Sequence, residues 1–244
     1  MHKFFTEELD DVFAYIRGDD HKHLSRVLRL KEQDEILIND LKGQDYLGRI
    51  ETIDKNETKV ELREKVPESN ESSLKLTLFQ GLPKAGKMDL IVQKCTELGV
   101  QRIVPVVTER VVVKNSSEFK KLDRLKRICL EAAKQSKRSV LPEITEPMSF
   151  AELLMEMKRL DVFVVPYENQ EEYGFLTLKK ELANISSMGI FVGPEGGFTE
   201  KEIDLLKDKG AKILTLGNRI LRTETAGFTA VAMAQLLYGD MGGK

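Results

Sequence analysis

Apolar and polar positions alternate along this chain with two different periods. Within the first seventy residues, runs with a period of two cover 35–40, 46–53 and 58–64, and turn-forming residues separate them. Such alternation predicts strands that bury one face. Just before them, 21–30 carries apolar residues at helical spacing. This part of the chain is therefore expected to form a small β-barrel or sheet with one short helix.

From residue 74 onward, nearly continuous apolar runs alternate with segments of helical period. Apolar strands with helices between them are typical of an α/β fold, a parallel sheet covered by helices on both faces. Ser149 and Thr199, each with Glu three residues later, form capping boxes that mark two helix starts. We expect strands at 74–80, 100–107, 161–167, 188–193 and 211–217, and helices from 88 to near Gly99, over 118–136, from 150, from 200 to near Gly210, and over 225–238.

A polar stretch without periodicity, 64–73, separates the two patterns and is typical of a linker. We therefore expect two domains, 1–70 and 71–244. The formal net charge of −2 is unevenly divided, because the first 73 residues carry 12 Lys and Arg against 18 Asp and Glu, whereas the remainder carries 26 against 22. The densest group of cations lies in 114–138.

Several classes of protein lack their characteristic residues here. Cys95 and Cys129 form no CxxC motif, and no grouping of Cys and His suggests a metal site. The N-terminus has no apolar signal-peptide core, and no segment has the ~18 to 20 apolar residues of a membrane span. We therefore expect a cytoplasmic protein without membrane contact. The absence of histidine and of GxSxG, HExxH and GxGxxG motifs after residue 73 argues against hydrolase triads, zinc peptidases and common dinucleotide enzymes.

One motif has the form of a nucleotide-binding loop but lacks a required residue. The segment from Gly81 to Lys87 matches the loop, yet Met88 stands where Ser or Thr supplies a magnesium ligand. A P-loop NTPase is therefore a distant alternative. At the start of the predicted helix, Lys84 and Lys87 are placed to contact a phosphate backbone.

Two loops carry the strongest functional signal. GPEGGF, from Gly193 to Phe198, follows an apolar strand, and its three glycines allow a ligand to approach the backbone closely. GNRILRTETA, 217–226, follows the next strand along the chain and holds Ile220 and Leu221 among polar residues, suited to covering a flat apolar ligand such as a purine. Ligands of parallel sheets bind outside the carboxyl ends of the strands, so we expect one pocket lined by both loops.

The last predicted helix is apolar on nearly all sides. Such a helix is buried on more than one face. Two interpretations stay open at this point, burial in the core of one chain and burial in a subunit interface.

Five segments together resemble a known family. QKCTELGV (93–100), IVPVVTER (103–110), EAAKQSKRSVLPEI (131–144), GPEGGFTEKE (193–202) and LGNRILRTETA (216–226) occur in the order seen in RsmE-type ribosomal RNA methyltransferases of the SPOUT superfamily, and HLSRVLRLK (23–31) extends the likeness. The resemblance implies a PUA-like β-barrel followed by an α/β domain whose last part forms a trefoil knot. It also implies a homodimer formed through the knot and the last helix.

The resemblance further implies methylation of uridine N3 in small-subunit ribosomal RNA, free or assembled, with S-adenosyl-L-methionine as the cofactor. The residues expected to bind the cofactor are Gly193, Pro194, Glu195, Gly196, Gly197, Leu216, Gly217, Asn218, Ile220, Leu221 and Arg222. Uridine N3 carries a proton, and this domain lacks histidine. We therefore take Glu195 or Glu224 as candidate base and Arg222 as candidate stabiliser of the uracil oxyanion.

A basic surface is expected to hold the RNA backbone. Its candidate residues are Arg26, Arg29, Lys84, Lys87, Arg110, Arg124, Arg127, Lys134 and Arg138. The main alternative is a non-catalytic RNA-binding or assembly protein with a vestigial cofactor pocket. The three glycines of GPEGG argue against it, because a pocket without function has no need of them.

Overall fold

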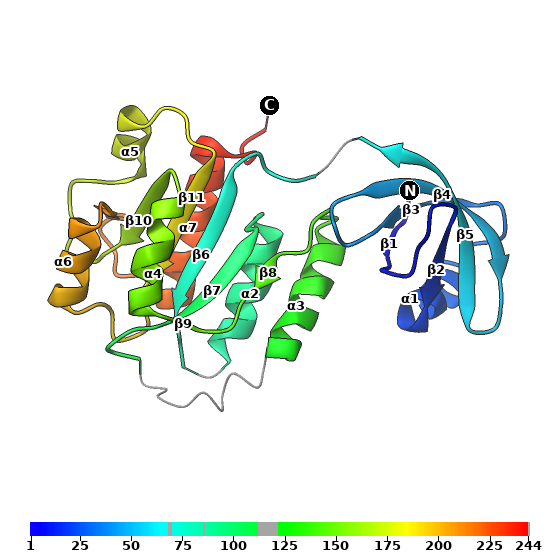
Figure 1. Cartoon of the computed structure of the whole chain (residues 1–244), viewed down its shortest axis with the longest axis horizontal. Coiled ribbons are helices and arrows are strands. Elements are labelled where there is room, and N and C mark those ends of the chain that lie inside the picture. Colours follow the sequence, from blue (N-terminus) through cyan, green and yellow to red (C-terminus); the bar gives the residue numbers. More distant parts are fainter. Residues whose placement is uncertain (68–69, 85, 112–121, 244) are drawn as a thin grey trace. The chain divides into compact units, whose positions relative to one another are not determined.

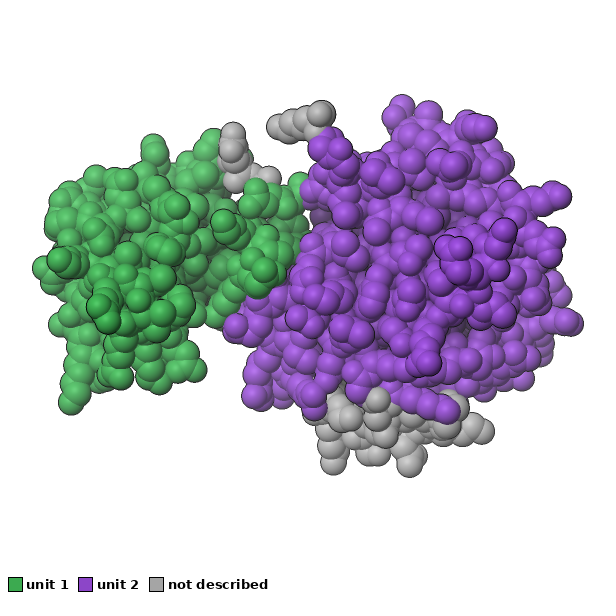
Figure 2. Space-filling model, turned by 180° about the vertical axis from the view of Figure 1, so that it is seen from behind, with its two compact units in different colours: residues 1–71, 133–141 green, residues 72–132, 142–244 purple. Residues whose placement is uncertain are grey.

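The computed structural model describes residues 1–67, 70–84, 86–111 and 122–243. Contacts divide the chain into two compact units, shown in Figure 2. Unit 1 comprises Met1–Glu71 and Ala133–Leu141, and unit 2 comprises Ser72–Ala132 and Pro142–Lys244. Within the described residues, no helix is both long and apolar enough to cross a bilayer.

Unit 1 is built on a curled five-stranded sheet with the order β1-β3-β4-β5-β2 (Figure 1). The three predicted strands are confirmed as β3 (Glu35–Asn39), β4 (Asp45–Ile53) and β5 (Glu57–Val66), which pair antiparallel. The two edge strands, β1 (Lys3–Phe5) and β2 (Phe13–Arg17), were not predicted, since such short runs carry little period. Alternate residues of the sheet form the core of the unit, together with Leu24.

The predicted helix over 21–30 is shorter and irregular. It forms α1 (Gly18–Lys22) and one π-helical turn, η1 (His23–Val27). Arg29 follows with a φ of 54°, a left-handed conformation that ends the helical path.

The predicted linker over 64–73 is partly structured. Strand β5 continues to Val66, and the Glu71 carboxylate accepts backbone N–H bonds from Ser139 (2.8 Å) and Val140 (3.0 Å). Its second oxygen lies 2.5 Å from the guanidinium of Arg138. Tertiary contacts thus hold Glu71 in place, and 68–69 of the predicted linker lie outside the described residues.

Unit 2 contains a parallel sheet, as predicted. Its strand order is β12-β10-β11-β6-β7-β8, with β9 beside β7. Strand β10 lies between β11 and β12, so the two strands that precede the glycine loop and the GNRILR loop are not neighbours. The strands are β6 (Lys75–Gly81), β7 (Arg102–Val107), β8 (Glu143–Ile144), β9 (Met148–Ser149), β10 (Val162–Pro166), β11 (Ser187–Val192) and β12 (Lys212–Leu214).

Helices cover both faces of this sheet (Figure 1). On one face α4 and α6 bury Leu153, Ile203 and Leu206 against Phe79 and Phe191 of the central strands. On the other, α7 packs on β6 and β11, and α2 packs on α7. The helices are α2 (Lys87–Glu97), α3 (Leu122–Gln135), α4 (Phe150–Glu156), α5 (Phe175–Glu181), α6 (Glu200–Asp208) and α7 (Thr223–Tyr238).

Most predicted helix limits are confirmed. Ser149 and Thr199 form capping boxes, each accepting a bond from the backbone N–H three residues later. Helix α2 ends just before Gly99, whose φ of 86° suits a glycine. Helix α5 was not predicted, and the part of the predicted helix over 118–121 lies outside the described residues. The trefoil knot stays a prediction.

Candidate active site

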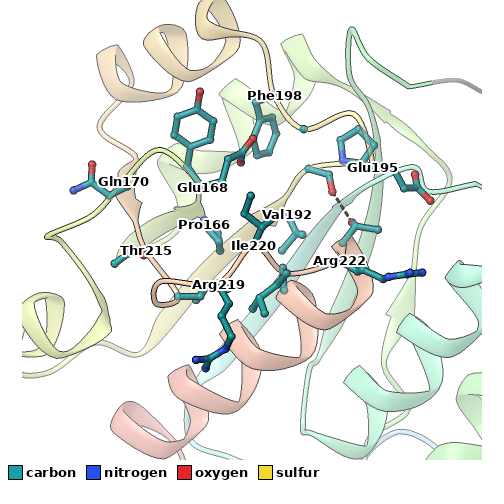
Figure 3. A pocket seen from close by; sticks show the side chains of 18 of the residues that line it. Pro166, Glu168, Gln170, Val192, Glu195, Phe198, Thr215, Arg219, Ile220 and Arg222 are labelled. Carbon is teal, nitrogen blue, oxygen red and sulfur yellow. Dashed lines mark hydrogen bonds between the residues drawn. The ribbon is translucent and has the colours of Figure 1, made fainter.

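A pocket of about 850 Å³ lies at the carboxyl ends of β10, β11 and β12 (Figure 3). All eleven residues expected to bind a cofactor line it, so the structure brings both predicted loops together. Their contact with a cofactor stays a prediction. The pocket is also lined by residues without a sequence prediction of this role, Lys87, Pro166, Tyr167, Glu168, Gln170, Glu171, Val192, Phe198, Thr215, Arg219, Thr223 and Ala226.

The segment after β10 was missed for a topological reason. Because β10 lies between β11 and β12, its end must face the same pocket as the two predicted loops. Its Glu168 lies beside the glycine loop, since a Cβ on Gly197 would come 3.1 Å from Glu168 Oε1. Only the strand order shows that the segment after β10 lines the pocket.

The glycine loop needs its glycines for space and for conformation. A Cβ on Gly193 would lie 3.1 Å from the ring of Phe198, which is buried against Phe191 in the core. Gly197 has a φ of 65° and closes a turn by donating to the Pro194 carbonyl at 2.9 Å. The turn leaves the loop backbone on the pocket surface.

The second loop presents an apolar side chain between two cations. Ile220 is 88% exposed although it is apolar, and Figure 3 shows it over the middle of the pocket. The side chains of Arg219 and Arg222 extend from the loop in different directions (Figure 3). Gly217 has a φ of 115°, a conformation that disfavours any other residue.

A chain of hydrogen bonds joins the two loops to the central strand. The Thr223 hydroxyl donates to the Gly193 carbonyl at 2.5 Å and accepts from Gln80 Nε2 at 2.9 Å. Gln80 is fully buried. Thr223 follows Arg222 directly in the motif, but no sequence signal predicts this contact, because its partners lie far away along the chain. The three residues fix the glycine loop against the start of α7.

The two candidate bases share one cation. The Lys87 ammonium lies 3.2 Å from Glu195 Oε1 and 3.0 Å from Glu224 Oε2. Burial raises the pKa of both carboxyls, but backbone hydrogen bonds and Lys87 together outweigh it and hold each pKa below its ordinary value. Both are therefore ionised near neutrality, and their role as base stays a prediction.

The segment that resembles a P-loop binds a carboxylate of the chain itself. The backbone N–H of Lys84 donates to both oxygens of Glu195, at 3.1 and 3.2 Å. A carboxylate of the chain thus takes the place at the start of α2 where a P-loop would hold a phosphate.

The residues predicted to bind RNA fall into several groups. Arg110 donates to the Gly196 carbonyl at 3.0 Å, and Lys84 and Lys87 contact the preceding residue, Glu195. On α3, Arg127 is exposed, and Arg124 is exposed and paired with Asp89. Arg26 and Arg29 are exposed in unit 1, where Lys134 pairs with Asp20 at 2.9 Å.

Arg138 is a correction to that set. Its side chain is 4% exposed and is bound by Glu71, because residues 133–141 pack into unit 1. A phosphate contact would require removing this buried guanidinium from its carboxylate. The structure therefore argues against an RNA contact for Arg138.

Comparison with known proteins decides the family. Residues 70–235 match an RNA methyltransferase domain, and residues 16–63 match an RNA methyltransferase PUA domain. The chain belongs to this RNA methyltransferase family. The match to the PUA domain explains the curled sheet of unit 1, and the match to the methyltransferase domain spans both pocket loops.

Relatives of this methyltransferase are similar over nearly their whole length. The ribosomal RNA small subunit methyltransferase E of Bacillus subtilis is 35% identical, with 98% of this chain and all of that protein covered. A crystal structure of the same-named enzyme from Neisseria gonorrhoeae, bound to S-adenosyl methionine, is 32% identical, has a TM-score of 0.84 and is covered to 99%, as is this chain. A methyltransferase of Legionella pneumophila, in complex with the same cofactor, is 27% identical, with a TM-score of 0.83 and 98% coverage of both chains.

Proposed function

We propose that this protein transfers a methyl group from S-adenosylmethionine to N3 of a uridine in small-subunit ribosomal RNA. The observation that carries the proposal is the single pocket lined by both predicted loops. Relatives with the small-subunit methyltransferase name, one of them bound to the cofactor, support it. An enzyme of ribosomal RNA would act in the cytoplasm.

The pocket suits this cofactor in size and chemistry. Its volume of about 850 Å³ lies within the range of small-molecule sites. The exposed Ile220 offers an apolar surface for an adenine ring, and Glu168 and Glu171 offer carboxylates for hydroxyl or ammonium groups. The loop backbone is open to close approach at Gly193, Gly196 and Gly197, which have no side chain. When bound, the cofactor supplies an electrophilic methyl group on a good leaving group.

The chain's own residues would orient the acceptor and stabilise its charge. Uridine N3 becomes nucleophilic as it loses its proton, and the charge then spreads over the neighbouring carbonyl oxygens. Arg222 lies at the N-terminus of α7, where its guanidinium can bind such an oxygen. Glu195, which lines the pocket, and Glu224, in the first turn of α7, are both ionised and are the proposed proton acceptors. Most of the rate gain would come from positioning the two reactants.

The RNA surface is proposed to include exposed cations of each unit. Arg110 is anchored to the glycine loop, and Arg127 stands exposed on α3. Arg26 lies in the π-helical turn of unit 1 and Arg29 follows two residues after it, both within the PUA match. These side chains can reach phosphate oxygens without leaving a buried carboxylate.

A second copy of the chain is the proposed partner of α7. Residues Thr223, Gly227, Ala230, Val231 and Ala234 of this helix are buried, but Leu236 is 58% exposed and Phe228, Met233 and Leu237 are only half-buried. An apolar helix with an uncovered side is typical of a subunit interface. Leu236→Arg should shift the mass seen by light scattering from dimer to monomer, and a monomeric wild type would contradict the proposal.

The decisive experiment measures the modified nucleoside. Small-subunit ribosomal RNA and assembled subunits from cells lacking the enzyme are incubated with protein and methyl-labelled cofactor, then digested and analysed by mass spectrometry. We expect labelled N3-methyluridine from at least one substrate. If the folded protein binds the RNA but forms no methylated nucleoside, the non-catalytic alternative is favoured instead.

A further inference from the structure

Three charged side chains from three segments of unit 2 meet at the edge of the pocket. Lys87 is the first residue of α2, Glu195 lies in the loop after β11, and Glu224 lies in the first turn of α7. The Lys87 ammonium is within 3.2 Å of an oxygen of each carboxylate. One cation therefore joins the glycine loop to the helix that follows the GNRILR loop.

Lys87 is better placed for this contact than for an RNA phosphate. Its side chain is 28% exposed, and those of Glu195 and Glu224 are 24% and 14% exposed. Charges this far removed from water interact more strongly than surface pairs do. The close contact with the Glu224 carboxylate raises the pKa of Lys87, so the side chain stays a cation.

We propose that Lys87 is a positioning residue of the cofactor pocket, whose ammonium neutralises Glu195 and Glu224 and so holds the two pocket loops in their binding arrangement. The proposal rests on the proposed function for the identity of the ligand. Without Lys87, the two carboxylates that now share one nitrogen face each other with no cation between them, although Glu195 keeps the backbone N–H of Lys84. Their repulsion, no longer offset by the two ion pairs with Lys87, pushes the glycine loop away from α7.

Calorimetric titration with S-adenosylhomocysteine tests this role in the full-length protein. This neutral probe is chosen because a sulfonium cation would itself be attracted to unpaired carboxylates. Lys87→Met should weaken binding at least tenfold, and Lys87→Arg should stay within about threefold of the wild type. Lys94→Met is the matched control, because Lys94 lies on the same helix and pairs with Glu97 at 2.9 Å away from the pocket lining. It should not change the affinity.

A double variant separates charge compensation from simple packing. In K87M/E224Q one carboxylate is removed as well, so affinity should recover at least threefold relative to K87M. A purely structural role for the lysine side chain predicts no recovery. The proposal is overturned if K87M binds within twofold of the wild type, or if the double variant binds no better than K87M.

Folding outcomes are informative too. If K87M is unfolded by circular dichroism while K87M/E224Q folds, unpaired charge is the cause and the proposal stands. If both are unfolded, Lys87 acts in the fold rather than in the pocket, and the proposal fails.

A ligand-free measurement keeps the two proposals separable. If the wild type binds neither form of the cofactor, the proposed function fails while the loop contact can still be tested. Hydrogen exchange should then be at least fivefold faster in K87M over 193–198 and 222–226. Equal exchange in K87M and wild type would contradict the positioning role.

Discussion

Two groups of paired charges in this protein differ in how far they are removed from water. In unit 1, Arg138 and Glu71 are 4% and 10% exposed, and Glu71 also accepts two backbone N–H bonds. At the pocket, Lys87 and its two carboxylates keep between 14% and 28% exposure. The first group is enclosed by residues of unit 1, whereas the second borders the pocket. Similar chemistry thus stabilises a fold in one unit and shapes a binding site in the other.

The physical reason lies in the cost of desolvation. A buried charge whose partner is removed cannot be hydrated, so the free energy of unfolding of the whole protein falls. A partly exposed charge at a pocket is rehydrated when its partner is lost, so the effect appears mainly as altered loop position and ligand affinity. The following changes are expected to separate these two behaviours, from the largest effect to the smallest.

Removing the carboxylate in unit 1 should have the largest effect on stability. Glu71→Ala removes the carboxylate beside the buried Arg138 guanidinium and the acceptor of two backbone N–H groups, and should lower the free energy of unfolding by about 3 kcal/mol. Urea denaturation measures this loss. Glu61→Ala, which removes an exposed pair with Arg63, is the control and should cost less than about 0.5 kcal/mol. Equal losses in the two variants would show that Glu71 is not a buried anchor.

Removing Arg222, a second cation at the pocket, should affect turnover and not stability. Arg222→Met removes the proposed oxyanion partner, so kcat should fall about 100-fold. Because Arg222 is exposed, the melting temperature should stay the same. Arg219→Met, whose side chain leaves the loop in another direction, should lose less than about tenfold. A native rate in Arg222→Met, measured by methyl incorporation under saturating cofactor, would remove this residue from the mechanism.

Backbone strain should lower ligand affinity when it is introduced at the pocket and lower only stability when it is introduced elsewhere. Gly217 and Gly210 have φ values of 115° and 91°, and no atom would lie within 4 Å of an added Cβ at either. Because Gly217 lines the pocket, Gly217→Ala should weaken cofactor binding about tenfold, the equivalent of ~1 to 2 kcal/mol of strain. Gly210→Ala, after α6, should cost about 1 kcal/mol of stability and leave calorimetric affinity unchanged. Equal affinity losses would mean that the strain is not local.

The exposed cation on α3 should change the salt dependence of RNA binding. Arg127→Gln should lower the slope of log affinity against log salt by about 0.7 to 0.9, the contribution of one phosphate contact. Lys201→Gln, an exposed cation on α6, is the control and should keep the wild-type slope. Filter binding over a salt series measures both, and an unchanged slope for Arg127→Gln would place α3 outside the interface.

The smallest effect is expected at a fully exposed carboxylate. Hydrogen bonds from the hydroxyl and backbone N–H of Ser186, and from the N–H of Ser187, lower the pKa of Asp161 to about 2. Since this pKa lies below the unfolded value near 4, the contribution to stability is complete above pH 4 and is lost as the pH falls toward 2. Asp161→Asn should therefore flatten the loss of melting temperature between pH 4 and 2, and parallel curves would contradict the assignment.

Much of unit 2 could be predicted from the sequence because its signals are local. Continuous apolar runs gave the five main strands, and the capping boxes at Ser149 and Thr199 placed two helix starts. The glycines at 193–197 pointed to a loop that must accept close approach, and this loop does line the pocket. The short edge strands and α5 were missed because a few residues carry too little period.

The remaining site residues depend on strand order and long-range contact. Strand β10 lies between β11 and β12, and this alone brings Glu168 to the pocket. Gln80 and Thr223 meet across 143 positions of the sequence, and Lys87 meets Glu195 across more than a hundred. The sequence assigned Lys87 to RNA from its place at a helix start and Arg138 from the density of cations, and neither signal shows that a distant carboxylate binds the side chain.

The amino-acid sequence by itself determined the two kinds of domain, the positions of the pocket loops and the uneven distribution of charge. These follow from hydrophobic period, from the conformational freedom of glycine and from composition, which are properties of neighbouring residues. Only the tertiary structure decided which cations face solvent, which anchor 133–141 within unit 1, and which one lies between two carboxylates at the pocket. Burial and pairing determine how strongly a charged side chain interacts, and both depend on segments that lie far apart along the chain.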